Sequence, residues 1–119
     1  GDILNIDVTL KKDGFFGDTS KTFMVGQVTP EAQRLVQTAY DAMMVGIEAI
    51  KPNGWTGDIG FETDKFVTRK GYSTIKEICG HGIGRVFHTD PFVPAFGKKG
   101  KGEKLKPFTC FTVEPMVNE

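Results

Sequence analysis

The sequence predicts a mixed fold of the α/β or α+β class, and three observations carry that prediction. Apolar and polar residues alternate over residues 3–10, a capped helical pattern begins at Thr29, and 15 of the 119 residues are glycine. Alternation is typical of a strand, whereas so much glycine indicates tight turns and close backbone contacts rather than a helical bundle. The composition, 39% hydrophobic and 25% charged, is that of an ordinary globular domain and excludes the disordered, collagen-like and membrane classes.

A β-hairpin is predicted at the start of the chain. Residues 3–10 form its first strand, with Asp7 on the polar face. Asp13-Gly14 is typical of a two-residue hairpin turn, and a second strand returns through residues 15–25. Because Asp18 lies in the returning strand, we expect Asp7 and Asp18 to face each other on neighbouring strands.

Two helices are predicted next. Thr29 is a favourable N-cap, Pro30 a favourable first residue, and Pro52 ends the pattern. The first of these helices has an apolar stripe of residues three and four apart: Leu35, Val36, Ala39, Tyr40, Met43, Ile47 and Ile50. A second helix is expected from about Gly57 to Lys70, with Thr56 as its cap. Its expected core residues are Ile59, Phe66 and Val67.

The last 40 residues alternate between glycine-rich and apolar segments. Residues 80–84 place His81 among glycines, which predicts an interrupted strand or a loop with closely placed side chains. Residues 97–104 are rich in lysine and glycine and predict an exposed loop. Residues 108–116 have a strand-like pattern that contains Glu114. An acid within a buried strand needs a partner, because an isolated buried carboxylate is costly.

Charge and cysteine content narrow the expected partners. The 15 basic and 15 acidic residues give no net charge and no overall attraction for nucleic acid or an anionic bilayer. The apolar runs fall far short of the roughly 20 residues that a membrane span needs. Cys79 and Cys110 form no close-spaced metal or redox motif. We therefore expect neither a nucleic-acid nor a membrane partner, and a cytoplasmic location.

Four residues carry the candidate chemistry: Asp7, Asp18, His81 and Glu114. Each is a metal-capable side chain in an apolar or glycine-rich setting, where burial favours pairing or metal binding. Divalent cations held between carboxylates and an imidazole would generate a hydroxide at neutral pH, which indicates a hydrolytic site. Singly, each residue also fits an ordinary role, as a turn acid, a hydrogen-bonded loop histidine or an exposed strand-end acid.

Taken together and in order, the motifs resemble a known family. The chain is similar to type I methionine aminopeptidases in four segments: Asn5-Ile6-Asp7-Val8-Thr9, Gly17-Asp18-Thr19-Ser20, Gly80-His81-Gly82-Ile83-Gly84-Arg85 with Phe87-His88, and Thr112-Val113-Glu114-Pro115-Met116. The resemblance extends over residues 1–119. It implies the pita-bread fold, mainly antiparallel sheet with helices on one face, around a dinuclear metal site. It also implies that residues 1–119 are a partial catalytic domain without its N-terminal and C-terminal parts.

The resemblance also implies a role for each residue. Asp7 would chelate one metal, Asp18 would bridge both, and His81 and Glu114 would bind the other. His88 would bind the substrate and act as a catalytic residue, and Phe87 would form a wall of the methionine pocket. Two cations of cobalt, manganese, iron or zinc would bind a hydroxide that attacks the first peptide bond of a nascent polypeptide. Glu114 would also handle a proton as a catalytic residue.

The resemblance implies parts that this sequence does not contain. A second bridging Glu is expected beyond residue 119 and a substrate-facing histidine before residue 1, so the fragment alone is predicted to bind metal weakly and to be poorly active. Phe108 stands where the family usually has glycine, which predicts backbone strain if that turn needs a positive φ. A monomeric complete enzyme is expected, and association with the ribosome is left open.

Three other interpretations compete with a methionine-specific enzyme. A proline-directed metalloaminopeptidase would share the fold and the ligand types, although its relatives carry Glu-Pro-Gly where this chain has Glu114-Pro115-Met116. A non-catalytic pita-bread binding module would lack several ligands. Finally, the four candidate residues could belong to an unrelated α/β domain in which they never meet.

Overall fold

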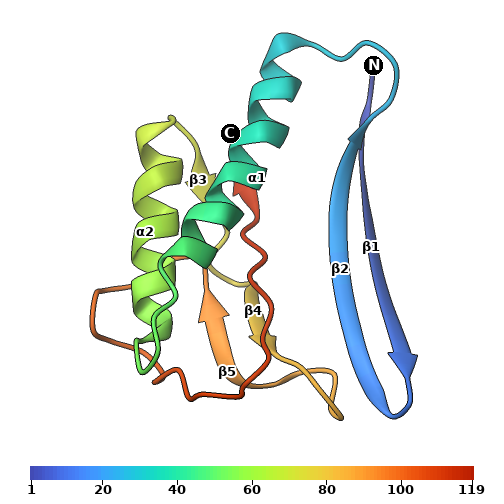
Figure 1. The fold of residues 1–119 in the computed structure, drawn as a ribbon. Coiled ribbons are helices and arrows are strands. Elements are labelled where there is room, and N and C mark those ends of the chain that lie inside the picture. The colour runs from blue at the N-terminus through green and yellow to red at the C-terminus, as the bar shows by residue number, and fades with distance from the viewer.

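The computed structural model describes all of residues 1–119 and has two helices and six strands. In chain order these are β1 (Ile3–Lys12), β2 (Phe15–Met24), α1 (Pro30–Glu48), α2 (Thr56–Arg69), β3 (Ser73–Thr74), β4 (Cys79–Gly82), β5 (Thr89–Pro94) and β6 (Val117–Asn118). The strands form three two-stranded antiparallel ladders, β1–β2, β3–β6 and β4–β5. Helix α2 packs against α1 and β5, and the β1–β2 hairpin stands on the side away from α2 (Figure 1).

The predicted hairpin and its turn are confirmed, although β1 extends to Lys12 and β2 ends at Met24. Asp13 and Gly14 connect the strands with φ angles of 51° and 84°, the positive values that a type I′ turn requires at both central positions. The register places Asp18 opposite Thr9 and Asp7 opposite Ser20. Directly opposed residues point to the same face of a ladder, so both carboxylates lie on one face. They are diagonal neighbours in this register and do not oppose each other directly, contrary to the prediction.

Helix α1 begins as predicted and ends earlier. The Thr29 hydroxyl accepts a hydrogen bond from the Ala32 N–H at 3.2 Å, and Pro30 is the first helical residue. The helix stops at Glu48, so the predicted continuation to Pro52 is wrong. A proline disfavours the helical conformation of the residue before it, and here the last turn already closes with the Ile50 N–H bonded to the Ile47 carbonyl.

The buried face of α1 differs from the predicted stripe. The buried residues of this helix are Thr38, Ala42 and Gly46, which are spaced by four, whereas Tyr40 is 56% exposed. Small residues let the second helix approach closely, and a Cβ at Gly46 would lie 2.8 Å from the hydroxyl of Thr63 in α2. Close helix–helix contact therefore selects a face that a count of large apolar residues does not identify.

Helix α2 begins at Thr56, one residue before the predicted start, with Trp55 as its N-cap. The predicted cap at Thr56 is therefore wrong. The Asp58 carboxylate accepts the Trp55 N–H at 3.0 Å, and the Thr56 hydroxyl instead accepts the Glu103 N–H at 3.0 Å. The lysine-rich loop 97–104, exposed as predicted, thus covers the start of this helix.

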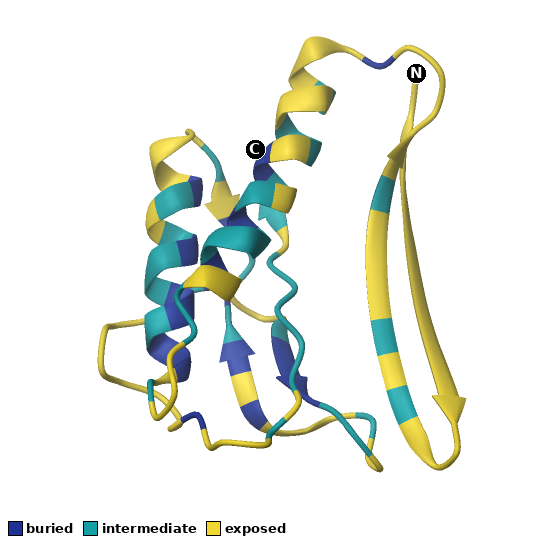
Figure 2. Cartoon of the chain, in the orientation of Figure 1, coloured by how far each residue is buried: buried dark blue, intermediate teal, exposed yellow.

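The core is small and lies between α2 and the strands. Ile59, Val93 and Leu105 form one buried cluster, and Val67 is also fully buried, whereas the predicted core residue Phe66 is only half-buried. Figure 2 shows that buried residues concentrate in this part, whereas the hairpin is largely exposed. Neither helix has the length and apolar character that crossing a bilayer requires.

The predicted strand over residues 108–116 does not form as a regular strand. Only Phe111 makes an isolated bridge, to Gly82, and the regular strand is β6, one residue further on. Pro115 has no N–H to donate to a ladder, and Phe108 adopts φ +65°. That left-handed conformation confirms the expected strain, and the Phe108 side chain is fully exposed.

Candidate metal centre

Three of the four predicted metal ligands converge on one point. Asp18, His81 and Glu114 each present a ligand atom, and these atoms all lie within 4.8 Å of one another. His81 Nε2 lies 3.6 Å from Asp18 Oδ2 and 3.5 Å from Glu114 Oε1. The residues come from β2, from β4 and from the segment before β6, so folding brings together three distant parts of the chain.

His81 is the buried centre of this cluster, with 4% exposure. Its Nδ1 lies 3.0 Å from the Gly82 carbonyl oxygen. Since a carbonyl only accepts, Nδ1 carries the proton, and in the neutral ring Nε2 presents its lone pair to the two carboxylates. A backbone carbonyl that fixes the tautomer in this way is the usual support of a metal-binding histidine.

The glycines on either side of His81 are required by close backbone contacts. A Cβ at Gly80 would lie 2.3 Å from the Thr112 carbonyl oxygen, and one at Gly82 would lie 2.1 Å from the Asp90 carbonyl oxygen. No side chain fits at such distances. The Gly-His-Gly motif therefore allows two neighbouring segments to approach β4 directly, and one of them carries Glu114.

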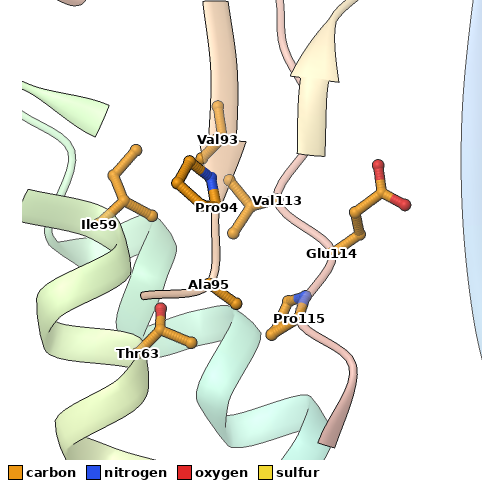
Figure 3. A pocket seen from close by; sticks show the side chains of 8 residues that line it. All are labelled: Ile59, Thr63, Val93, Pro94, Ala95, Val113, Glu114 and Pro115. Atoms are coloured by element: carbon orange, nitrogen blue, oxygen red, sulfur yellow. The ribbon is translucent and has the colours of Figure 1, made fainter. Parts of the chain in front are cut away.

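Glu114 is positioned by Thr112 and by the alternation of its segment. The Thr112 hydroxyl donates to Glu114 Oε1 at 2.5 Å and accepts the His81 N–H at 2.9 Å. Val113 packs on the core cluster. Figure 3 shows Glu114 pointing away from the apolar side chains of Ile59 and Val93 that line the small cavity beside it.

The two hairpin carboxylates are placed differently. The Thr9 hydroxyl donates to Asp18 Oδ1 at 2.7 Å, and Asp18 Oδ2 faces His81. Asp7 shares the face of Asp18 but is displaced along the ladder, opposite Ser20, and lies outside the group of three. The structure thus places Asp7 beside the centre rather than within it.

Both residues predicted to contact substrate lie against His81. The His88 ring centroid is 4.2 Å from that of His81 and 3.8 Å from that of Phe87. The Phe87 ring meets the His81 ring edge-on, with a centroid distance of 5.6 Å. His88 is exposed and Phe87 half-buried, so an imidazole and an apolar ring border His81 on a side that is open to solvent.

The donor set fits a divalent cation. Neither Asp18 nor Glu114 is paired with a Lys or Arg, and both carboxylates face Nε2 of the buried His81 imidazole, at 3.6 and 3.5 Å. Two carboxylates so close to each other repel unless positive charge lies between them. Carboxylate oxygen with one imidazole nitrogen suits manganese, iron, cobalt or zinc.

Thr9 and Thr112 are site residues that the sequence analysis did not identify. Each orients a carboxylate by a hydroxyl hydrogen bond, and such supporting bonds tune a metal site. A signal existed in both cases. Thr112 lies two residues before Glu114, on the same side of an extended segment, and Thr9 is the cross-strand partner of Asp18.

The fold and the donor set are those of a metalloprotein, and comparison of the chain with known proteins identifies its class. Residues 1–119 match metallopeptidase family M24, and the chain belongs to that family. It is 47% identical over all its length to "Methionine aminopeptidase A" of Synechocystis sp., of which it covers 47%. The crystal structure of methionine aminopeptidase from Rickettsia prowazekii superposes with a TM-score of 0.96 at 48% identity, over 99% of this chain and 48% of that one.

A more distant structure shares the fold but much less of the sequence. Prolidase from Pyrococcus furiosus shares the fold at a TM-score of 0.83 but only 22% identity, over 97% of this chain and 33% of that one. The resemblance to methionine aminopeptidases and the pita-bread architecture are thus confirmed. The chain spans about half the length of the relatives it matches.

Proposed function

We propose that the protein carrying this chain removes the N-terminal methionine from nascent polypeptides by hydrolysing the first peptide bond. The observation that supports this proposal most directly is the convergence of ligand atoms of Asp18, His81 and Glu114 within 4.8 Å of one another. Membership of a metallopeptidase family supports metal use, and 46–50% identity to proteins named methionine aminopeptidase supports the substrate class. Residues 1–119 would then be a partial catalytic domain.

In this proposal Asp7, Asp18, His81 and Glu114 hold two divalent cations. Cations bound there would supply Lewis acidity and lower the pKa of water toward neutrality. Glu114 keeps Oε1 bonded to Thr112, so Oε2 is the oxygen available to take a proton. Which metal is native depends on availability as well as on the donor set.

Two rings would position the peptide. His88 is exposed beside His81, where its imidazole can donate a hydrogen bond to the carbonyl oxygen of the bond being cut. Phe87 provides an apolar wall against His88. An aromatic surface suits the flexible, polarizable thioether of a methionine side chain.

The alternatives receive less support. A proline-directed peptidase is represented here by fold likeness at 22% identity, whereas the methionine-specific relatives are about twice as identical. A binding module without metal chemistry would not need the buried imidazole and the two carboxylates that the chain retains. Both free cysteines suit the reducing cytoplasm. Association with the ribosome and a monomeric state stay predictions.

The test uses the full-length protein and a matched pair of variants. Metal content and hydrolysis of a methionyl-alanyl peptide are measured for wild type, Asp18→Asn and Asp13→Asn. Asp13→Asn makes the same change in the same hairpin, at an exposed turn position with positive φ that asparagine tolerates. We expect Asp18→Asn to lose metal and activity by a factor of about 100 or more, and Asp13→Asn to match wild type.

Each other outcome contradicts a specific part of the proposal. Unchanged metal affinity in Asp18→Asn would mean that the cluster is not the metal site. Metal binding without methionyl-peptide hydrolysis would refute the substrate assignment, and cleavage of X-Pro dipeptides instead would favour the proline-directed alternative. Two tight sites in the isolated 119-residue chain would contradict the predicted weak binding of the fragment.

A further inference from the structure

An aromatic contact joins the β1–β2 hairpin to the loop that carries the substrate-facing rings. Phe16 in β2 stacks on Phe87, with ring centroids 5.5 Å apart and planes 23° from parallel. The Phe16 N–H donates to the Gly84 carbonyl at 2.8 Å, so backbone and side chain both connect at this point. Phe16 precedes Asp18 by two residues and therefore lies on the same face of the hairpin.

Phe16 is the outer member of a continuous row of rings. It contacts Phe87, and Phe87 contacts both His88 and His81. The ammonium group of Lys11 lies 4.8 Å from the Phe16 centroid. Phe16 does not itself touch a proposed metal ligand in this row, so any effect it has on the site passes through Phe87.

We propose that Phe16 is a positioning residue that holds the Phe87 ring as the wall for the first side chain of the substrate. This inference rests on the proposed function. Phe87 belongs to residues 83–88, which form no regular helix or strand. A stacked neighbour restricts the orientations open to a half-buried aromatic side chain, and losing it restores rotamer freedom that binding must then remove.

The ring and the backbone of Phe16 make different contacts, so a substitution can remove the ring contact and keep the backbone bond. Replacing Phe16 with alanine removes the stack but leaves its N–H free to bond Gly84. The docking of the hairpin and the placement of Asp18 should therefore persist. The expected consequence is weaker binding of a methionine side chain without a loss of metal.

The experiment uses the full-length protein with Phe16→Ala, Phe16→Tyr and Phe23→Ala. Steady-state kinetics on a methionyl-alanyl peptide are combined with metal content and with calorimetric binding of L-methionine. For Phe16→Ala we expect KM and the Kd of L-methionine to rise about fivefold, because a factor of that size corresponds to the loss of one aromatic pair. The kcat and the metal content should stay unchanged. Phe16→Tyr keeps a stacking ring and should match wild type.

Phe23→Ala is the matched control. Phe23 lies in the same strand, on the opposite face, where it contacts Lys21 rather than the site loop. Unchanged KM in Phe16→Ala, an equal rise in Phe23→Ala, or loss of metal in Phe16→Ala would each overturn the proposal. A wild-type protein that does not cleave the peptide would instead refute the proposed function, so the two failures are distinguishable.

Discussion

Replacing Gly80 with alanine should damage the site through the backbone rather than through a ligand. The new Cβ would lie 2.3 Å from the Thr112 carbonyl oxygen, whereas real Cβ contacts essentially never fall below 3.0 Å, so the two segments must separate by at least 3.0 − 2.3 = 0.7 Å. Both are backbone, and no flexible side chain can absorb the shift. Because Glu114 follows Thr112 by two residues, the movement separates Glu114 from His81.

The size of this shift sets the expected loss. Metal–ligand distances tolerate deviations of about 0.2 Å, so a displacement of 0.7 Å exceeds what the donor set can accommodate. We expect metal affinity to fall about 10- to 100-fold, the usual cost of disturbing the groups that orient a ligand. Overpacking should also lower the free energy of unfolding by about 1–3 kcal/mol.

The assay is metal titration and peptide hydrolysis in the full-length protein. Gly17→Ala is the control, because it makes the same change next to Asp18, where an added Cβ meets nothing within 4 Å. It should keep wild-type metal affinity. If Gly80→Ala also binds metal like wild type, the close contact of β4 with the Thr112 segment does not determine the position of Glu114.

Three further predictions concern single interactions. Thr112→Val should weaken metal binding about 10-fold or more, because the carboxylate of Glu114 loses its hydrogen-bond donor. Metal titration of Thr112→Ser, which keeps the hydroxyl, should show wild-type affinity. A loss of affinity in Thr112→Ser would contradict the role of the hydroxyl in orienting Glu114. Phe108→Gly should raise the free energy of unfolding by about 0.5–1 kcal/mol, because glycine relieves the cost of φ +65° and the exposed ring makes no buried contact. If denaturant unfolding shows Phe108→Gly to be no more stable than Phe108→Ala, the backbone strain at this position is refuted. The Lys99 ammonium, 2.6 Å from Glu62, lowers the pKa of that carboxyl below its usual 4.5. Its stabilisation is therefore present above pH 4.5 and lost as pH falls through the lowered pKa, so the Tm difference between wild type and Glu62→Gln should shrink under acid, and a constant difference would contradict the linkage.

Local patterns predicted the parts of the fold that local rules determine. The Asp13-Gly14 turn and the Thr29 cap depend on a few adjacent residues, and both were correct. The buried face of α1 was partly wrong, because the approach of α2 selects small residues at Ala42 and Gly46. Strand β5 was not predicted, since its pairing with β4 is set by tertiary structure.

The candidate site was predictable from the sequence for a different reason. Asp18, His81 and Glu114 were identified because acids and an imidazole stood in apolar or glycine-rich segments, and their order resembled a known family. The structure adds their convergence within 4.8 Å. It also adds the hydroxyl groups that orient them, which sequence reasoning missed because Thr9 and Thr112 have many unremarkable roles in extended chain.

The site joins two parts of the chain that otherwise touch little. The β1–β2 hairpin carries Asp7 and Asp18, and its two strands are almost entirely exposed. His81 and Glu114 belong to the other part. The hairpin meets that part through the Phe16 stack, the Arg85 guanidinium over the Phe15 ring, one backbone bond and the approach of Asp18 to His81. A cation held by ligands from both parts would favour the docked hairpin over open arrangements by its free energy of binding. Metal binding and hairpin docking would then be one linked equilibrium, in which the backbone bond from Phe16 to Gly84 and the carboxylate of Asp18 act on the same conformational change.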